Sequence, residues 1–136
     1  MSEAVPKLQI KDLGITYVGQ DGRRTEAVAD VSLEIGDKPG IGEVVVFLGP
    51  SGCGKSTILK AVAGLLRPTT GEILLEGKRI ESVGRDRGMV FQSYTSFGWL
   101  TVRENVEYGL RLQGVPRAER HERSTRYLKA VGLDEV

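Results

Sequence analysis

The order of apolar and polar positions divides the chain into a part with a period of two and a part with helical spacing. Residues 8–18 alternate in two halves, which predicts a strand with an irregularity near residues 12–14. The apolar positions of the two halves are Leu8, Ile10, Leu13, Ile15 and Tyr17. Residues 28–35 resume the alternation between turns at 19–22 and 36–40, so the first 48 residues are expected to form antiparallel β-structure.

A β-branched apolar run at residues 43–48 predicts a buried strand, and the residues after the next glycine-rich stretch have helical spacing. The apolar members of that helix are Ile58, Leu59, Ala61, Val62, Leu65 and Leu66. We expect the helix to run over residues 55–66 and to stop at Arg67, because Pro68 disfavours helical geometry at the residue before it.

Short strands follow this helix. Residues 72–75 and 78–80 predict two strands joined by a tight turn, and residues 88–91 predict another buried strand. The segment after it is irregular and aromatic, with Tyr94, Phe97 and Trp99 close together in a predicted loop.

Two helices are predicted in the last third of the chain. Thr101 and Glu104 have the spacing of a capping box, so a helix should start at residue 102 and end before Gly114. Its inward-facing residues are expected to be Val106, Tyr108 and Leu110. Pro116 suits the first turn of a second helix that runs to Val131, with Gly132 as its C-terminal stop.

The glycine-rich stretch between the predicted strand and the first helix has the pattern G-x-x-x-x-G-K-[ST]. Its residues are Gly49, Pro50, Ser51, Gly52, Cys53, Gly54, Lys55, Ser56 and Thr57. Glycines allow backbone N–H groups to turn inward as an anion-binding nest, and the following helix adds the positive end of its dipole. We expect Lys55 to reach the β- and γ-phosphates of a nucleotide, Ser56 to ligate Mg²⁺ and Thr57 to donate to the α-phosphate. A glycine turn without function is the alternative.

Composition narrows the classes of function. The chain has 136 residues, about one domain, and a formal net charge of +1, so nothing global argues for nucleic acid or an anionic membrane. No apolar run approaches the roughly 20 residues of a transmembrane helix, and the N-terminus lacks a signal-peptide pattern, so a cytosolic location is expected. Cys53 is the only cysteine, which excludes an intrachain disulfide.

Arginine recurs every three residues in the last predicted helix, at Arg117, Arg120, Arg123 and Arg126. Interleaved Glu119 and Glu122 favour a solvated helix face over a stripe that binds nucleic acid. His121, the only histidine, lies on the same helix and is interpreted as a surface residue.

Taken together, these motifs resemble the nucleotide-binding subunit of an ATP-binding cassette (ABC) transporter along nearly the whole chain. Residues 29–35 resemble the segment before the family's phosphate loop, and residues 64–73 resemble the connection after the next helix. The resemblance implies an α/β phosphate-loop NTPase fold of ABC type, with an antiparallel β subdomain and a partial parallel core sheet. It also implies that Tyr17 stacks on adenine. Residues 90–92 are similar to the glutamine loop, in which Gln92 would ligate Mg²⁺ and help to place the attacking water.

Within the family, residues 84–94 and 99–106 look like the importers of nitrate, sulfonate, taurine and related small anions. This resemblance implies that the protein works with ATP and Mg²⁺ on the inner face of the cell membrane. Its expected partners are a second nucleotide-binding subunit and a membrane-spanning permease subunit, the latter contacted through residues 92–100. Gly98 departs from relatives that often carry proline before the tryptophan, so a less rigid loop is expected there.

Other parts of such subunits do not occur in this sequence, namely the Leu-Ser-Gly-Gly-Gln-type signature, the strand ending in Asp-Glu and the later histidine. Residues 131–135 imitate that strand, but Gly132 interrupts the apolar run and no signature precedes it. The chain therefore resembles the first half of a single ATP-binding domain, cut before the signature. The expected segments are a β lead-in at about 1–48, the phosphate loop and helix at 49–66, a β segment with the glutamine loop at 67–100, and a helical region at 101–136.

Two functions of different classes stay open. One is ATP binding as part of an importer's ATPase motor, with Lys55 and Gln92 as the catalytic residues. The other is a non-catalytic product that binds nucleotide weakly or not at all. Slow or no hydrolysis is expected without the Asp-Glu pair, and apolar sheet edges should be exposed. A third interpretation, a phosphate-loop kinase or GTPase, is disfavoured by the β-rich lead-in and by the absence of an Asn-Lys-x-Asp motif.

Overall fold

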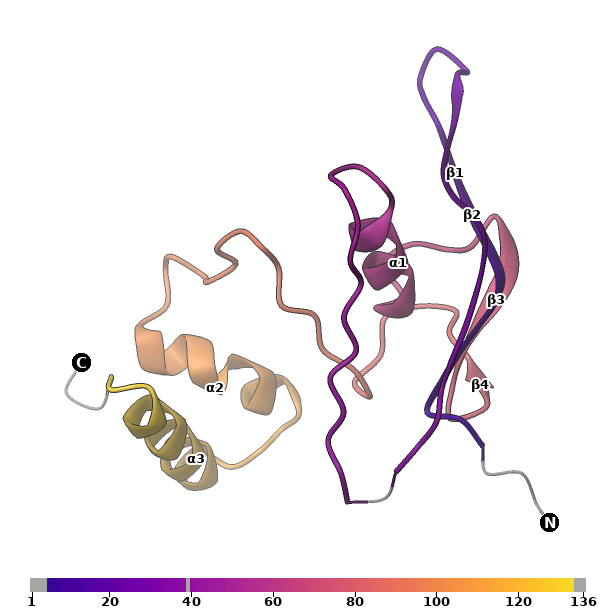
Figure 1. Cartoon of the computed structure of the whole chain (residues 1–136). Coiled ribbons are helices and arrows are strands. Elements are labelled where there is room, and N and C mark those ends of the chain that lie inside the picture. Colours follow the sequence, from indigo (N-terminus) through magenta and orange to yellow (C-terminus); the bar gives the residue numbers. More distant parts are fainter. Residues whose placement is uncertain (1–4, 39, 134–136) are drawn as a thin grey trace. The chain divides into compact units, whose positions relative to one another are not determined.

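A computed structural model describes residues 5–38 and 40–133. The chain divides into two compact units, Met1–Met89 and Val90–Val136, which are described separately below (Figure 1). No helix of the described residues combines the length and apolar character needed to cross a membrane.

The first unit is built on a four-stranded sheet in the order β2-β1-β3-β4, in which every neighbouring pair is antiparallel. The strands are β1 (Leu8–Val18), β2 (Arg24–Ile35), β3 (Thr70–Leu75) and β4 (Lys78–Arg79). The antiparallel lead-in is thus confirmed, although β2 begins four residues earlier than expected. β1 lies in the centre because it pairs with β2 on one side and β3 on the other.

The irregularity expected in the first strand is confirmed. The register of β1 against β2 shifts on both sides of Leu13, and Asp12 has a φ of 49°. Ser32 on β2 fixes this bulge, because its hydroxyl oxygen accepts from the Asp12 N–H at 2.9 Å and the hydroxyl donates to Asp12 Oδ1 at 3.0 Å. The bulge lets apolar residues on both sides of it, Ile10 and Leu13, reach the same core.

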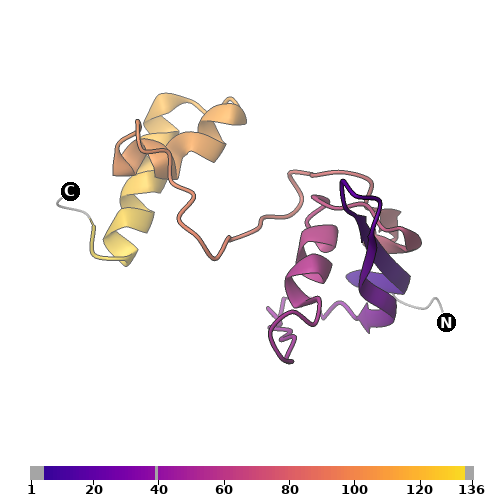
Figure 2. The same cartoon turned by 90° about the horizontal axis from the view of Figure 1, so that it is seen from above.

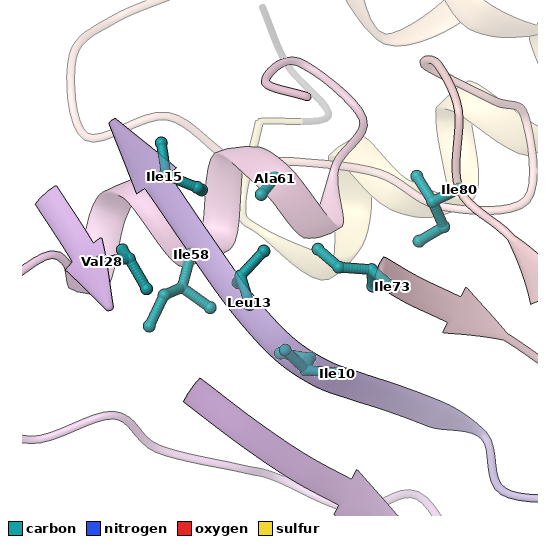
Figure 3. Close-up of a cluster of buried hydrophobic side chains, with 8 residues drawn as sticks. All are labelled: Ile10, Leu13, Ile15, Val28, Ile58, Ala61, Ile73 and Ile80. Atoms are coloured by element: carbon teal, nitrogen blue, oxygen red, sulfur yellow. The ribbon is translucent and has the colours of Figure 1, made fainter. Parts of the chain in front are cut away.

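Helix α1 (Lys55–Val62) covers one face of this sheet and completes the core of the unit (Figure 3). Ile58 and Ala61 are the buried residues of α1. They pack among side chains of all the longer strands, and the whole buried cluster is Ile10, Leu13, Ile15, Val28, Ile58, Ala61, Ile73 and Ile80. The helical spacing is thus confirmed in part: Val62 and Leu66 also pack against this core, whereas Leu59 and Leu65 are exposed.

The first helix is shorter than predicted: it ends at Val62 rather than near Arg67. The N–H of Gly64 donates to Ala61 O and the N–H of Leu65 donates to Lys60 O, both at 2.9 Å. This pair of bonds is a Schellman motif, which needs a left-handed residue, and Gly64 has a φ of 78°. The glycine, and not the later proline, ends the helix.

Two predicted strands are wrong for the residues described. Residues 43–48 and 88–91 run as irregular chain without a sheet partner. Their side chains are largely exposed, with Val44 at 91% and Val90 at 98% of full exposure, and only Phe47 packs partly on the core. Apolar β-branched composition alone does not make a strand, because each N–H and C=O of a strand needs a neighbouring strand. The expected partial parallel sheet is absent from the described residues, and the expected exposure of apolar sheet edges stays a prediction.

The second unit is a helical pair, α2 (Val102–Leu112) and α3 (Arg117–Ala130), which pack against each other (Figures 1 and 2). The capping box is confirmed: Glu104 N–H donates to Thr101 Oγ1 at 3.2 Å, and Thr101 N–H donates to Glu104 Oε2 at 2.8 Å. The predicted inward face of α2 is wrong in part, since no residue of this helix is buried and Val106 is 38% exposed.

Polar contacts join the two helices instead. Arg103 Nη1 donates to Ser124 Oγ at 3.2 Å and to Thr125 Oγ1 at 2.8 Å. Ser124, which is fully buried, donates to Glu107 Oε1 at 2.9 Å. Leu128 is the buried apolar residue of α3. The two helices are therefore matched by hydrogen bonds as much as by apolar surface, which the hydrophobic spacing alone could not indicate.

Replacement of Gly64 should destabilise the first unit. A Cβ at Gly64 would lie 2.2 Å from the carbonyl oxygen of Ser82, in addition to the strain of a positive φ. We expect Gly64→Ala to cost about 2–4 kcal/mol in urea unfolding followed by far-UV circular dichroism. Gly22→Ala is the control, because Gly22 also has a positive φ but has no atoms within 4 Å of the position that a Cβ would take, and it should cost only about 1 kcal/mol. Equal losses would contradict the steric argument.

Acid should weaken the start of α2. The Thr101 backbone N–H, bound to the carboxylate, holds the pKa of Glu104 below its ordinary value of 4.5. A lowered pKa means that the carboxylate contributes stability above the unfolded value and that this contribution is lost as the pH falls through the folded value. The thermal stability of the Glu104→Gln variant should therefore depend less on pH between neutral and acid solution than that of the wild type. An identical pH profile for the two proteins would contradict this assignment.

Candidate phosphate-binding site

The glycine loop enters α1 through a backbone conformation that only glycine adopts easily. Gly54 is the N-cap of α1 with a φ of 93°, and its carbonyl oxygen accepts from the Ile58 N–H at 2.9 Å. A Cβ on Gly54 would stand 2.5 Å from Ala27 O on β2. The loop is thus held close to the sheet at this point, and any side chain at residue 54 would push it away.

The side chain of Lys55 lies across the loop. Its Nζ donates to Gly49 O at 2.8 Å and to Pro50 O at 2.6 Å, and it lies 3.4 Å from Cys53 Sγ. The ammonium group is therefore inside the curve of residues 49–53. A cation in this position, next to the N-terminus of a helix, is suited to an anion with several oxygens.

The first turn of α1 supplies hydroxyl groups and no negative charge. It contains Ser56, which is exposed, and Thr57, which is half-buried, and it has no acidic residue. A serine oxygen is a hard ligand of the kind that Mg²⁺ takes together with water and phosphate oxygens. The residues present therefore fit a magnesium ion bound jointly with a phosphate chain.

Tyr17 lies at the end of β1 that is nearest to the loop. Gly54 contacts β2 at Ala27 and Val28, and Val28 pairs with Ile15 on β1. Tyr17 follows Ile15 by two residues and is 42% exposed. Its ring is available for stacking, and its contact with adenine stays a prediction.

Gln92 belongs to the second unit, where it is exposed in irregular chain. Its expected pairing with Ser56 on one metal ion is not decided by the geometry of either unit and stays a prediction. Cys53 is exposed in the loop, next to Lys55. The sequence interpretation missed Asn105, whose hydrogen bonds are described below. Its position four residues after the capping Thr101 was the available signal.

Loop, helix and antiparallel sheet together define a phosphate-loop protein, and comparison with known proteins narrows the class. The ABC transporter family matches residues 29–136, most of the chain. This chain therefore belongs to the ABC transporter family.

The relatives come from bacteria and archaea. Over 126 residues the chain is 46% identical to a nitrate import ATP-binding protein, NrtD, of Synechocystis, covering 93% of the chain and 46% of that protein. It is 41% identical to a taurine import ATP-binding protein, TauB, of Roseobacter denitrificans, covering 94% and 46%. An ABC transporter ATP-binding protein of Methanocaldococcus jannaschii is 42% identical, with 94% and 47% covered. The chain thus spans about half the length of the curated relatives that it matches.

Solved structures agree with this assignment. A dimeric ATP-binding cassette in a post-hydrolysis state, bound to ADP and phosphate, superposes with a TM-score of 0.69 at 33% identity, over 90% of this chain and 56% of that one. CbiO1 of Clostridium perfringens, part of an ABC transporter complex, gives a TM-score of 0.72 at 29% identity, over 96% and 52%. The expected phosphate-loop NTPase fold of ABC type is confirmed.

Loss of the Lys55 side chain should loosen the loop. Because its ammonium joins two carbonyls of the loop, we expect faster amide hydrogen exchange at residues 51–54 in Lys55→Ala than in the wild type. The Lys60→Ala variant is the control, since Lys60 is exposed on the same helix and should leave the loop unchanged. Equal exchange in all three proteins, measured by mass spectrometry, would show that Lys55 does not hold the loop.

Proposed function

We propose that this chain binds ATP as part of the ATPase motor subunit of an ABC importer for a small anion such as nitrate, a sulfonate or taurine. The observation that carries the proposal is the position of the Lys55 ammonium inside the glycine loop, 2.8 Å from Gly49 O and 2.6 Å from Pro50 O. On nucleotide binding, the same donors exchange these carbonyls for phosphate oxygens. Backbone N–H groups of the loop donate further hydrogen bonds to the phosphate oxygens.

The remaining site residues take separate parts in nucleotide binding. Residues 49–57 hold the phosphate chain, and Tyr17 stacks on the base. When bound, Mg²⁺ supplies charge neutralisation at the β- and γ-phosphates, with Ser56 and Gln92 as its protein ligands. Gln92 as a neutral amide binds metal and water without adding charge. Lys55 and Gln92 are the two residues to which we assign catalytic roles.

The partners are those of an importer motor. NrtD and TauB are named for nitrate and taurine import, which supports a small anion as the transported solute. We assign residues 92–100 to contact with a membrane-spanning permease subunit, on the inner face of the cell membrane. A second copy of the subunit completes the nucleotide site, as the dimeric cassettes among the similar structures suggest.

The exposed apolar segment at residues 43–48 fits the same proposal, because its β-branched composition suits pairing with a neighbouring strand at the entrance to the phosphate loop. No observation favours the alternative of a non-catalytic product.

Calorimetry with Mg·ATP tests the proposal. We expect saturable heat for the wild type and an affinity lower by about ten- to a hundredfold for Lys55→Ala, because charged hydrogen bonds contribute roughly 1.5–3 kcal/mol. Lys60→Ala should bind as the wild type does. No heat from a wild-type sample with a cooperative unfolding transition, or equal affinities of wild type and Lys55→Ala, would overturn the proposal.

A further inference from the structure

The side chain of Asn105 binds both ends of the segment that precedes α2. Its Oδ1 accepts from the Phe97 N–H at 2.7 Å. Its Nδ2 lies 3.1 Å from Phe97 O, 3.2 Å from Leu100 O and 3.0 Å from Thr101 O. One carboxamide thus uses its acceptor and both its hydrogens on the backbone of residues 97–101.

Aromatic rings attach the same segment to α2. The ring of Phe97 lies 4.5 Å from that of Tyr108, measured between centroids, and 5.2 Å from that of Trp99. The guanidinium of Arg111 lies over the Tyr108 ring at 5.1 Å. Phe97 and Tyr108 are half-buried, but Trp99 is 80% exposed. The outermost ring of this cluster of tilted rings is therefore open to a partner, with two rings and a cation behind it.

Gly98 gives this segment no side chain of its own to fix it. The expectation from the sequence is a less rigid loop at this position. The bonds of Asn105 bracket Gly98, from Phe97 on one side to Leu100 and Thr101 on the other, and Leu100 N–H donates to Phe97 O at 3.0 Å. A proline before the tryptophan would restrict the backbone of this segment directly. Here the side chain of Asn105 on α2 restricts it instead.

We propose that Asn105 is a positioning residue: its carboxamide holds residues 97–101 in the one conformation that presents Trp99 to the permease. The inference rests on the proposed function for the identity of the partner, but the ordering of Trp99 does not depend on it. A large aromatic residue held rigidly loses little side-chain entropy on binding, and tryptophan is enriched among the interface residues that carry most of the binding energy.

The sequence offers a direct probe, because Trp99 is the only tryptophan. Time-resolved fluorescence anisotropy of the purified protein should show a larger fast component in Asn105→Ala and Asn105→Asp than in the wild type. Asn105→Asp keeps the size and the acceptor and removes the donors. It also places a negative charge near the N-terminus of α2, which stabilises a helix. If Asn105 served only helix stability, Asn105→Asp would therefore leave Trp99 as ordered as in the wild type. Gln113→Ala changes an exposed amide at the C-cap of the same helix and should match the wild type, and far-UV circular dichroism should be unchanged throughout.

Presentation to the partner is tested with inside-out cell-membrane vesicles from the source organism, by co-sedimentation. We expect Asn105→Asp and Trp99→Ala to lower the affinity for these vesicles by about tenfold or more, and Gln113→Ala to leave it unchanged. Vesicles of the extracted lipids alone should not bind the protein.

The outcomes distinguish the positioning role of Asn105 from the permease contact of Trp99. Wild-type anisotropy in Asn105→Asp would overturn the positioning role. If Trp99 becomes more mobile in Asn105→Asp but this variant binds the vesicles as tightly as the wild type, the presentation of Trp99 to the permease would be overturned. Absence of vesicle binding by the wild type, or equal binding to lipid alone, would overturn the permease contact of the proposed function, while the anisotropy alone would then decide the role of Asn105.

Discussion

The candidate site depends on the packing of α1 against the antiparallel sheet. Ile58 and Ala61 fix the helix among the side chains of the sheet, and this sets the position of the helix N-terminus. The close approach of Gly54 to Ala27 then determines where the loop must curve. The geometry of the glycine loop is thus a consequence of the apolar packing of α1 on the sheet.

Local signals predicted local structure well. The bulge of β1, the capping box of α2 and the glycine after α3 all follow from residues within a few positions of one another. One local signal was overlooked, since Gly64 ends α1 before Pro68 does. The other failures occurred where the outcome depends on residues far away in the chain. Residues 43–48 have the composition of a strand, but a strand forms only when a neighbour is present, which no local pattern reports. Likewise, the loop residues of the candidate site follow from one local motif. The proposed sharing of one metal ion by Ser56 and Gln92 depends on tertiary structure, which no local pattern reports.

Polar groups decide the architecture of the second unit. α2 buries no residue, and its contact with α3 runs through Arg103, Glu107 and the fully buried Ser124. Hydrogen bonds of this kind are directional, so they fix the register of two helices more narrowly than an apolar stripe does. Asn105 extends the same principle to the preceding loop. Sequence patterns based on hydrophobicity do not detect such hydrogen-bond matching, which explains why the inward face of α2 was predicted only in part and why Asn105 was missed.

The glycine loop is anchored through α1, on its C-terminal side, while the residues on its N-terminal side make no sheet hydrogen bonds among those described. This asymmetry has a consequence for biosynthesis. As a nascent chain leaves the ribosome, β1, β2, α1 and β3 can pack before α2 and α3 are made. The curve of the glycine loop can accordingly take shape early in synthesis.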